Sequence, residues 1–388
     1  MSNTIDYLQW RGDLSLNSAP LCDVDLLVFS QMAYIPFDRI VPPNFSDSVA
    51  LSDASAAVID EARHHKHGTF FFWREDESLI TLLGSCERFR NVRLTGFLNI
   101  LSTEQEEQFA AVTALLPDGS AVVTFRGTDV SVVGWKEDFD LAVSESIPAQ
   151  REAVKYIADF SKAFDGKIML TGHSKGGNLA VFSYAFAPDS VKPRLLGARN
   201  FDGPGFNEKV ISSEKLKSIS SEVKTILPNS SVIGMLLGHD EDFRIIESSN
   251  YNIFQHDPYS WKVSGSDFIT AEKFTNSSQL IDTTLKSWIS SMPDEMRRKL
   301  IDIIFTELNS SQSSNVIEAL LKTGILPRID RLDRESAKLL IDATLRFNGA
   351  VTDTFRQFIS KSNRKLFFLA KKKGDASQEP ESQTPLLK

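Results

Sequence analysis

Residues 167–177 read KIMLTGHSKGG, and this stretch decides the fold class. Its first five residues form a short apolar run typical of a buried strand, and a G-x-S-x-G motif centred on Ser174 follows at once. The next residues, 178–187, have the spacing of a helix. A serine on a tight turn between strand and helix is lifted above the sheet, where only small neighbours avoid a clash. The sequence therefore predicts that Ser174 is a catalytic nucleophile, and not a serine in an ordinary strand-to-helix turn.

The segments around this motif alternate between strand and helix patterns. Two apolar runs, 108–116 and 120–127, flank the turn signal Pro117-Asp118-Gly119 and predict a β-hairpin. The other elements predicted in this region are a helix at 151–164 and strands at 195–201 and 222–228. Alternating strands and helices indicate an α/β fold with a mostly parallel sheet flanked by helices.

Four regions follow from the pattern along the chain. Residues 1–66 are predicted as an N-terminal helical segment that could cover the core, and residues 67–267 as the α/β core. Residues 268–373 are helical throughout and predict a C-terminal helical appendage. Residues 374–388 are polar and contain prolines, which predicts a disordered tail.

Two apolar segments near the N-terminus allow more than one interpretation. Residues 20–35 form an amphipathic helix that is either a lid over an acyl pocket or a helix packed on the sheet. Residues 70–73, Phe-Phe-Phe-Trp, are predicted as a buried strand and not as a lipid-binding patch.

The overall composition excludes several classes of function. The 388 residues carry a net charge of −8, so no global positive field attracts nucleic acid. The N-terminus lacks the pattern of a signal peptide, and no apolar run approaches the length of a membrane span. The two cysteines, Cys22 and Cys86, cannot form a disulfide framework. We therefore expect a soluble, cytoplasmic protein, and the lack of metal and nucleotide motifs predicts that it needs no cofactor.

Acyl transfer at Ser174 would require donors for the developing oxyanion. One predicted donor is the backbone N–H of Lys175, the residue after the nucleophile. The second is expected in a loop after an earlier strand. The run 122–126 ends such a strand and turns at Gly127, which makes Thr128 the candidate through its N–H or its hydroxyl.

These motifs resemble a known family. The sequence FRGT at 125–128, Gly134-Trp135, Asp138 and TGHSKGG at 171–177 occur in the order typical of the class 3 (triacylglycerol) lipase branch of the α/β-hydrolases. FDGPGF at 201–206 stands where such lipases carry a related segment. The chain as a whole is more similar to a group of bacterial proteins of undetermined function that share this core. The resemblance implies an α/β-hydrolase fold and a serine-hydrolase mechanism, with an acyl ester or lipid-like substrate.

The base of the expected triad must follow Ser174 in the chain. Only His239 and His256 meet this condition, because the other histidines lie upstream or inside the motif. His256 follows the strand-like run YNIF at 251–254 and matches the place where the family has its histidine, so it is the predicted base.

The acid is less clearly marked. The family implies an aspartate within a stretch that matches 227–237 here, but Ser230 and Ser231 stand at the expected place. Asp202, at the end of the preceding predicted strand, is the favoured replacement. The alternatives are three other aspartates, Asp240, Asp242 and Asp257, or a Ser-His dyad in which Ser231 or a backbone carbonyl orients the imidazole.

Two further patterns have competing explanations. The histidines His64, His65 and His67 lack a cysteine or carboxylate at ligand spacing, so a solvated helix end is favoured over a metal site. The segment 362–374, SNRKLFFLAKKKG, combines basic and apolar residues. It could rest on an anionic membrane surface or form a basic helix end before the tail.

The sequence thus predicts a serine hydrolase that cleaves a carboxylic ester or thioester through an acyl-enzyme at Ser174. The alternative is a catalytically inactive α/β-hydrolase-fold protein that binds or scaffolds, which the missing acid motif would support.

Overall fold

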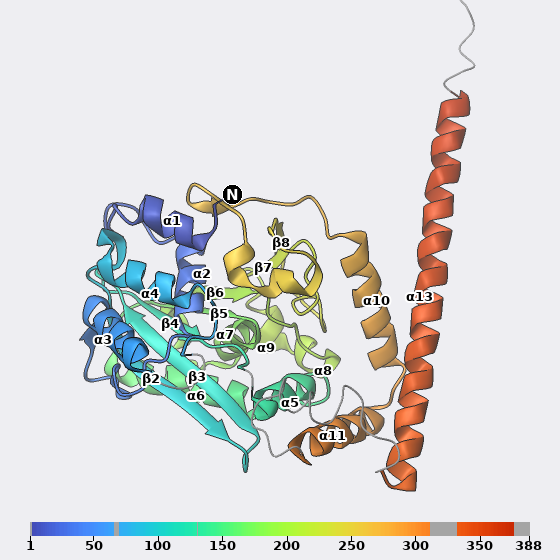
Figure 1. Cartoon of the computed structure of the whole chain (residues 1–388), viewed down its shortest axis with the longest axis horizontal. Helices are drawn as coiled ribbons and strands as arrows, with labels where there is room; N and C mark the ends of the chain where they lie inside the picture. The colour runs from blue at the N-terminus through green and yellow to red at the C-terminus, as the bar shows by residue number, and fades with distance from the viewer. Residues whose placement is uncertain (1, 66–69, 130, 311–331, 376–388) are drawn as a thin grey trace, which may run out of the picture.

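An eight-stranded sheet forms the centre of the molecule (Figure 1). The computed structural model describes residues 2–65, 70–129, 131–310 and 332–375. The strands lie side by side in the order of the sequence. Their bounds are β1 (Val49–Ala50), β2 (Arg93–Ser102), β3 (Glu107–Leu115), β4 (Ala121–Phe125), β5 (Ile168–His173), β6 (Leu195–Phe201), β7 (Val223–Pro228) and β8 (Phe243–Ile246).

The sheet changes from antiparallel to parallel at β4. Strands β1 to β4 pair antiparallel, and the predicted hairpin around Asp118 joins β3 to β4. Strands β4 to β8 pair parallel, so their carboxyl ends meet at the same edge of the sheet. The predicted strands at 195–201 and 222–228 are confirmed as β6 and β7, and the predicted α/β-hydrolase-like fold class with them.

Helices cover both faces of this sheet (Figure 1). Within the described residues they are α1 (Thr4–Arg11), α2 (Asp23–Met32), α3 (Leu51–His64), α4 (Asp76–Ser85), α5 (Val132–Asp140), α6 (Pro148–Ala163), α7 (Lys175–Phe186), α8 (Glu208–Ile211), α9 (Glu214–Lys217), α10 (Asn276–Ser290), α11 (Asp294–Ser310) and α13 (Arg334–Asp375). The alternation of side chains along β4 separates two hydrophobic cores. Val122 belongs to the core with the N-terminal helices, and Val123 to the core with α6 and α7.

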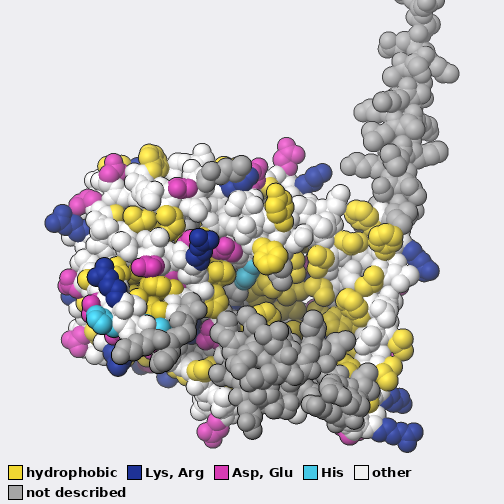
Figure 2. Space-filling view, viewed as in Figure 1, with side chains coloured by type: hydrophobic (Ala, Val, Ile, Leu, Met, Phe, Trp, Pro, Cys, Tyr) yellow, Lys and Arg dark blue, Asp and Glu magenta, His cyan; other side chains and the backbone are white. Residues whose placement is uncertain are grey.

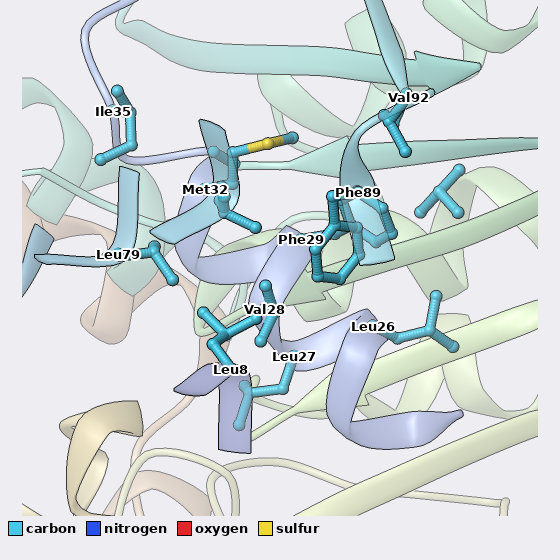
Figure 3. Close-up of a cluster of buried hydrophobic side chains, with 14 of the residues drawn as sticks. Leu8, Leu26, Leu27, Val28, Phe29, Met32, Ile35, Leu79, Phe89 and Val92 are labelled. Carbon is cyan, nitrogen blue, oxygen red and sulfur yellow. The ribbon is translucent and has the colours of Figure 1, made fainter. Parts of the chain in front are cut away.

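Helix α2 is a core element. Nine of its ten residues are buried, and it packs on β5, where Ser30 Oγ lies 2.9 Å from Thr171 Oγ1. Figure 3 shows Val28, Phe29 and Met32 of this helix among the buried side chains of the first core. Of the two interpretations of residues 20–35, the structure has the helix packed on the sheet.

Two predicted strands are absent, and both predictions were wrong. Residues 70–73 form a bend in which Phe72 is 38% exposed, and Asp76 Oδ2 fixes the turn by accepting the N–H of Trp73 at 2.8 Å. Residues 252–256 form a short 3₁₀ helix, η3 (Asn252–His256), in place of the strand expected from YNIF. Both segments are rich in aromatic residues, but neither lies beside a strand with which it could form backbone hydrogen bonds. Apolar character alone does not make a segment a strand.

The C-terminal helices dock on the α/β part at two places. Helix α11 packs on α5, with Phe305 and Phe139 rings 5.7 Å apart and Ile301 buried in a small shared cluster. The N-terminus of α10 contacts the loop after β7, where Ser278 Oγ donates a hydrogen bond to the carbonyl of Ser231. Helix α13 packs along α10 and then extends beyond the rest of the molecule (Figure 1). The predicted helical appendage is therefore confirmed, and the tail predicted at 374–388 lies outside the described residues from 376 onward.

None of the helices within the described residues is both long enough and apolar enough to cross a lipid bilayer.

Candidate active site

Ser174 occupies the sharp turn that the motif predicts. Strand β5 ends at His173, α7 begins at Lys175, and Ser174 between them has φ 59° and ψ −136°. This backbone conformation is costly for a residue with a side chain and persists only where the surroundings enforce it. The N–H of Ser174 donates to the carbonyl of Phe201 at 2.9 Å, which ties the turn to the end of β6. Such an enforced, strained turn is typical of a nucleophile elbow.

The flanking glycines are required by close approach. A β-carbon on Gly172 would lie 2.2 Å from the carbonyl carbon and oxygen of Gly176, and one on Gly176 would lie 2.1 Å from the carbonyl oxygen of Phe125. The first turn of α7 thus lies directly on the ends of β4 and β5. This explains why glycine is required two positions before and two positions after the serine.

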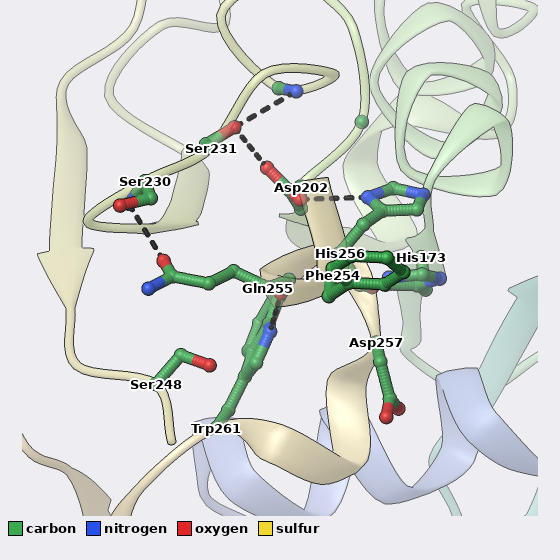
Figure 4. Close-up of polar contacts among 12 residues, drawn as sticks. His173, Asp202, Ser230, Ser231, Ser248, Phe254, Gln255, His256, Asp257 and Trp261 are labelled. Carbon is green, nitrogen blue, oxygen red and sulfur yellow. Dashed lines mark hydrogen bonds and ion pairs between the residues drawn. The ribbon is translucent and has the colours of Figure 1, made fainter. Parts of the chain in front are cut away.

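Asp202 and His256 meet at the carboxyl edge of the sheet. Asp202 directly follows β6, and its Oδ2 lies 2.7 Å from Nδ1 of His256 (Figure 4). The carboxylate is fully buried, whereas the imidazole is 21% exposed. Because a carboxylate can only accept, Nδ1 of His256 carries a hydrogen, which leaves Nε2 as the nitrogen with the lone pair in the neutral ring. His256 is therefore in the tautomer that a general base requires.

Ser174 is linked to this pair through its neighbour. His173 Nε2 donates to the carbonyl of His256 at 2.8 Å, and the two rings lie 4.6 Å apart. The hydrogen bonds among the described residues do not include one between the side chains of Ser174 and His256. Such bonds are often long in a protein without substrate and tighten in the complex.

A buried tyrosine that the sequence did not mark completes this contact. Burial and the nearby His256 hold the pKa of His173 well below its usual range, so the ring is neutral. Since its Nε2 donates to a carbonyl, its Nδ1 must accept, and Tyr34 OH at 3.2 Å is the donor. Burial raises the pKa of Tyr34, which keeps the hydroxyl protonated. Tyr34 follows α2 and is far from the motif in the sequence, so no local sequence pattern predicts its contact with His173.

The other candidate bases and acids are occupied elsewhere. Both ring nitrogens of His239 have partners, Glu241 Oε1 at 2.9 Å and the carbonyl of Gly234 at 2.6 Å. Asp257 Oδ1 accepts the N–H of Tyr259 at 2.9 Å and points away from His256 in Figure 4. Burial raises the pKa of Asp257 to about 6.

Asp240 and Asp242 are exposed, and the carboxylate that contacts His256 is that of Asp202. Ser231, the proposed member of a dyad, donates instead to Asp202 Oδ1 at 2.5 Å.

The two candidate oxyanion donors flank the serine. A β-carbon on Gly127 would lie 2.8 Å from Cβ of Ser174, so the loop after β4 touches the elbow just before Thr128. The hydroxyl of Thr128 donates to Asp138 Oδ2 at 2.6 Å. A hydroxyl has one hydrogen, so this bond leaves the backbone N–H of Thr128 as the donor for an oxyanion. Burial raises the pKa of Asp138 to about 6, although Lys175 and the bond from Thr128 oppose the rise.

Lys175 has separate roles for its backbone and its side chain. Its N–H begins α7 beside the serine, whereas its ammonium is 1% exposed and enters a buried cluster. Nζ donates to Glu137 Oε2 at 2.7 Å and to the carbonyl and Oε1 of Gln108 at 3.0 and 2.7 Å. All three ammonium hydrogens are thus used. The side chain joins α7 to α5 and β3, so the backbone N–H is the one donor of Lys175 that remains a candidate for an oxyanion.

Within the described parts of the chain, no group of three His, Cys, Asp or Glu side chains could hold a metal ion. His64 is exposed at the end of α3 and bonds the carbonyl of Asp60 at 2.7 Å, and His65 is also exposed. His67 lies outside the described residues.

Residues 83–306, more than half of the chain, match the model of the Mbeg1-like family. The chain belongs to the Mbeg1-like family. A search of the curated proteins gives no match for it.

Three solved structures are similar to this Mbeg1-like chain at low identity. The M37 lipase is 15% identical with a TM-score of 0.37, over 54% of this chain and 68% of the lipase. The Rhizomucor miehei lipase in its propeptide complex is 13% identical with a TM-score of 0.36, over 63% and 80%. A mutant form of MDLA from Penicillium cyclopium is 10% identical with a TM-score of 0.36, over 66% and 88%.

Proposed function

We propose that this Mbeg1-like protein is a serine hydrolase that cleaves a carboxylic ester or thioester. Ser174 attacks the acyl carbon while Nε2 of His256 takes its proton, and Asp202 stabilises the imidazolium that forms. The N–H groups of Thr128 and Lys175 hold the oxyanion. His256 then returns the proton to the leaving alcohol or thiol, and water hydrolyses the acyl-enzyme by the same route.

One observation carries this proposal. Asp202, directly after β6, and His256, in η3, are 54 positions apart in the chain, yet Asp202 Oδ2 lies 2.7 Å from His256 Nδ1 beside a strained serine turn. A carboxylate with 0% exposed side chain is retained at a sheet edge only where a partner compensates its burial. The chain order Ser, Asp, His is the order of α/β-hydrolase triads, which supports the proposed roles.

The surroundings support an apolar acyl substrate. Tyr251 and Phe254, both close to His256 in the chain, are 80% and 73% exposed. Figure 2 shows hydrophobic side chains gathered around a hollow between the α/β part and the C-terminal helices. Large exposed apolar groups of this kind mark binding surfaces more often than ordinary surface.

Labelling with a fluorophosphonate probe tests the proposal, because such probes react only with an activated serine. The wild-type protein is expected to be labelled, and the Ser174→Ala variant is expected to remain unlabelled. The Ser183→Ala variant is a matched control, since Ser183 lies on α7 with its hydroxyl bonded to the carbonyl of Ala180. Labelling that persists in Ser174→Ala would contradict the assignment of the nucleophile.

The inactive binding protein is the second candidate, and the lack of a Ser174–His256 hydrogen bond among the described residues is the observation that favours it. A folded wild-type protein that stays unlabelled, with and without detergent or liposomes, would favour this candidate. An ester-chain-length screen by calorimetry would then show binding without turnover.

We also propose a peripheral contact with lipid surfaces through the C-terminal segment 362–374. The support is that α13 exposes Leu345 and Phe355, at 64% and 55%, and continues into this basic and apolar stretch. Flotation with anionic vesicles tests the contact. Removal of residues 361–388 is expected to lower the bound fraction, and an unchanged fraction would contradict it.

A further inference from the structure

Helix α5 connects the two residues that carry the candidate oxyanion donors. Asp138 of this helix accepts the hydroxyl hydrogen of Thr128 at 2.6 Å. The neighbouring Glu137 accepts a hydrogen from Nζ of Lys175 at 2.7 Å. Thr128 and Lys175 carry the two N–H groups that are proposed to hold the oxyanion. Two successive side chains of one helix are thus bonded to both residues.

The carboxylate of Glu137 accepts three hydrogen bonds in the interior. Its Oε2 accepts from Lys175 and, at 3.3 Å, from the N–H of Gln108, and its Oε1 accepts from the N–H of Ala149 at 2.7 Å. Lys175 donates its two remaining ammonium hydrogens to the carbonyl and the side-chain oxygen of Gln108. The side chains of Glu137 and Lys175 are each 1% exposed. This buried network joins α7, α5, β3 and α6.

Helix α5 also packs closely on both sides of this arrangement. A β-carbon on Gly134 would lie 3.0 Å from Cγ2 of Thr128 and 3.1 Å from Oε1 of Gln108. Gly134 therefore lies between the residue that carries one donor and the residue that binds the ammonium of Lys175. It is one helical turn before Asp138, so a single turn of α5 makes all of these contacts.

Stability alone does not account for a charged pair at this place. Two charges lose their hydration on burial, and apolar residues of similar volume often stabilise a protein equally well or better. An ion pair with every partner satisfied supplies a defined geometry, because each hydrogen bond favours one distance and one direction. Geometry matters at the first residue of α7, since its N–H has to lie within hydrogen-bond distance of the oxyanion that forms at Ser174.

We propose that the buried ion pair between Lys175 and Glu137 sets the distance between the two oxyanion donors. The side chain of Lys175 has no hydrogen left for a substrate, so it acts as a positioning group for the backbone N–H of the same residue. Glu137 is a positioning residue that acts on Thr128 through Asp138 and the shared turn of α5. This inference rests on the proposed serine-hydrolase function and identifies what aligns its oxyanion hole.

A variant that removes both charges tests the proposal without leaving a buried ion unpaired. Lys175→Met, Glu137→Met is expected to lower kcat about ten- to a hundredfold with KM nearly unchanged, because displaced donors stabilise the transition state less and leave ground-state binding as it was. The matched control is Lys136→Met, which removes a neighbouring cation of α5 whose partners are Glu106 and Asp302. This control is expected to keep the wild-type kcat.

The affinity for a transition-state analogue separates positioning from a merely structural loss. A trifluoromethyl ketone forms a tetrahedral adduct when Oγ of Ser174 bonds to its carbonyl carbon, the serine proton passes to His256 and the carbonyl oxygen becomes the oxyanion. Its inhibition constant is expected to rise in the double variant by about the factor by which kcat/KM falls. A partly unfolded protein would instead show fewer active sites, counted by fluorophosphonate titration, with an unchanged inhibition constant.

A milder variant keeps the proposal testable if the double variant does not fold. Glu137→Gln retains one oxygen for Lys175, but its amide nitrogen cannot accept the N–H of Ala149. Both kcat/KM and the affinity for the ketone are therefore expected to fall severalfold together. A folded Glu137→Gln variant in which both quantities keep their wild-type values would overturn the proposal.

The proposed function and this inference fail in different ways. A folded wild-type protein that no fluorophosphonate labels would contradict the hydrolase function. With a labelled wild-type protein, four results would contradict only the positioning role of the ion pair. They are a folded double variant with wild-type kcat/KM, a loss confined to KM, a lower kcat with unchanged affinity for the ketone, and an equal loss of kcat in Lys136→Met.

Discussion

The elbow around Ser174 and the acid–base pair behind it are built in opposite ways. The elbow is local: strand, serine and helix follow one another within residues 167–187, and close glycine contacts hold them. The pair is assembled from distant segments, since Asp202 directly follows β6 and His256 lies in η3, after β8. The proposed nucleophile therefore depends on its own sequence motif, whereas the proposed base depends on how separate loops pack at one edge of the sheet.

The largest expected effect separates the two histidines downstream of the elbow. His256→Ala removes the base and is expected to lower kcat about ten-thousand-fold or more. His239→Ala keeps the side chains of Ser174, Asp202 and His256 and breaks the contacts of His239 with Glu241 and with the carbonyl of Gly234, so it should mainly lower stability. Steady-state kinetics with a short-chain ester and thermal unfolding of both variants measure the difference. Loss of hydrolysis in His239→Ala with an active His256→Ala would reverse the assignment.

The next effect, on stability, concerns the buried ion pair between Lys175 and Glu137. Lys175→Met leaves the carboxylate of Glu137 buried without its cation, which should cost about 3–5 kcal/mol of unfolding free energy. The double variant Lys175→Met, Glu137→Met removes both charges and is expected to be more stable than the single variant. Urea unfolding of the three proteins gives the comparison. A double variant no more stable than Lys175→Met would show that the unpaired charge of Glu137 is not the cause of the lost stability.

Part of the fold and of the candidate site could be predicted from the sequence, and part could not. The serine motif, the hairpin and the parallel strands follow from local spacing, and all were found where predicted. The contact between Asp202 and His256 agrees with the pairing that the sequence favoured, but only tertiary packing shows it. Tyr34 and the cluster around Glu137 gave no signal at all, because their partners lie in distant segments of the chain.

A smaller effect on kcat is expected at Thr128, in the loop after β4. It distinguishes the hydroxyl of Thr128 from its backbone N–H as the donor to the oxyanion. Thr128→Ala removes the hydroxyl but keeps the N–H, so kcat is expected to fall only about tenfold, through the freed side chain of Asp138. Loss of a true oxyanion donor typically costs about a hundred- to a thousand-fold. Thr128→Ser keeps both groups and should remain near wild type. Measurement of kcat for the two variants distinguishes the two donors. A thousandfold loss in Thr128→Ala would show that the hydroxyl itself contacts the oxyanion.

The smallest effect tests the packing of the bend at 70–73 behind the site. Asp76 is fully buried and accepts hydrogen bonds from Tyr259 OH at 2.7 Å and from the N–H of Trp73 at 2.8 Å. Burial raises its pKa to about 6, above the unfolded value near 3.9. Between these values the folded state binds a proton that the unfolded state has released. The free energy of unfolding therefore falls as the pH rises through this window, by at most about 1.4 kcal/mol per pH unit.

Asp76→Asn removes this titration and retains a carbonyl oxygen that can accept from Trp73 or Tyr259. The stability of the wild type relative to the variant should therefore decrease from pH 4 to pH 6 and stay level above it. Urea unfolding of both proteins at four pH values between 4 and 7 measures the difference. Glu77→Gln, on the exposed side of α4, is the matched control and should show no such slope. A constant difference between wild type and Asp76→Asn would mean that folding does not raise the pKa of Asp76.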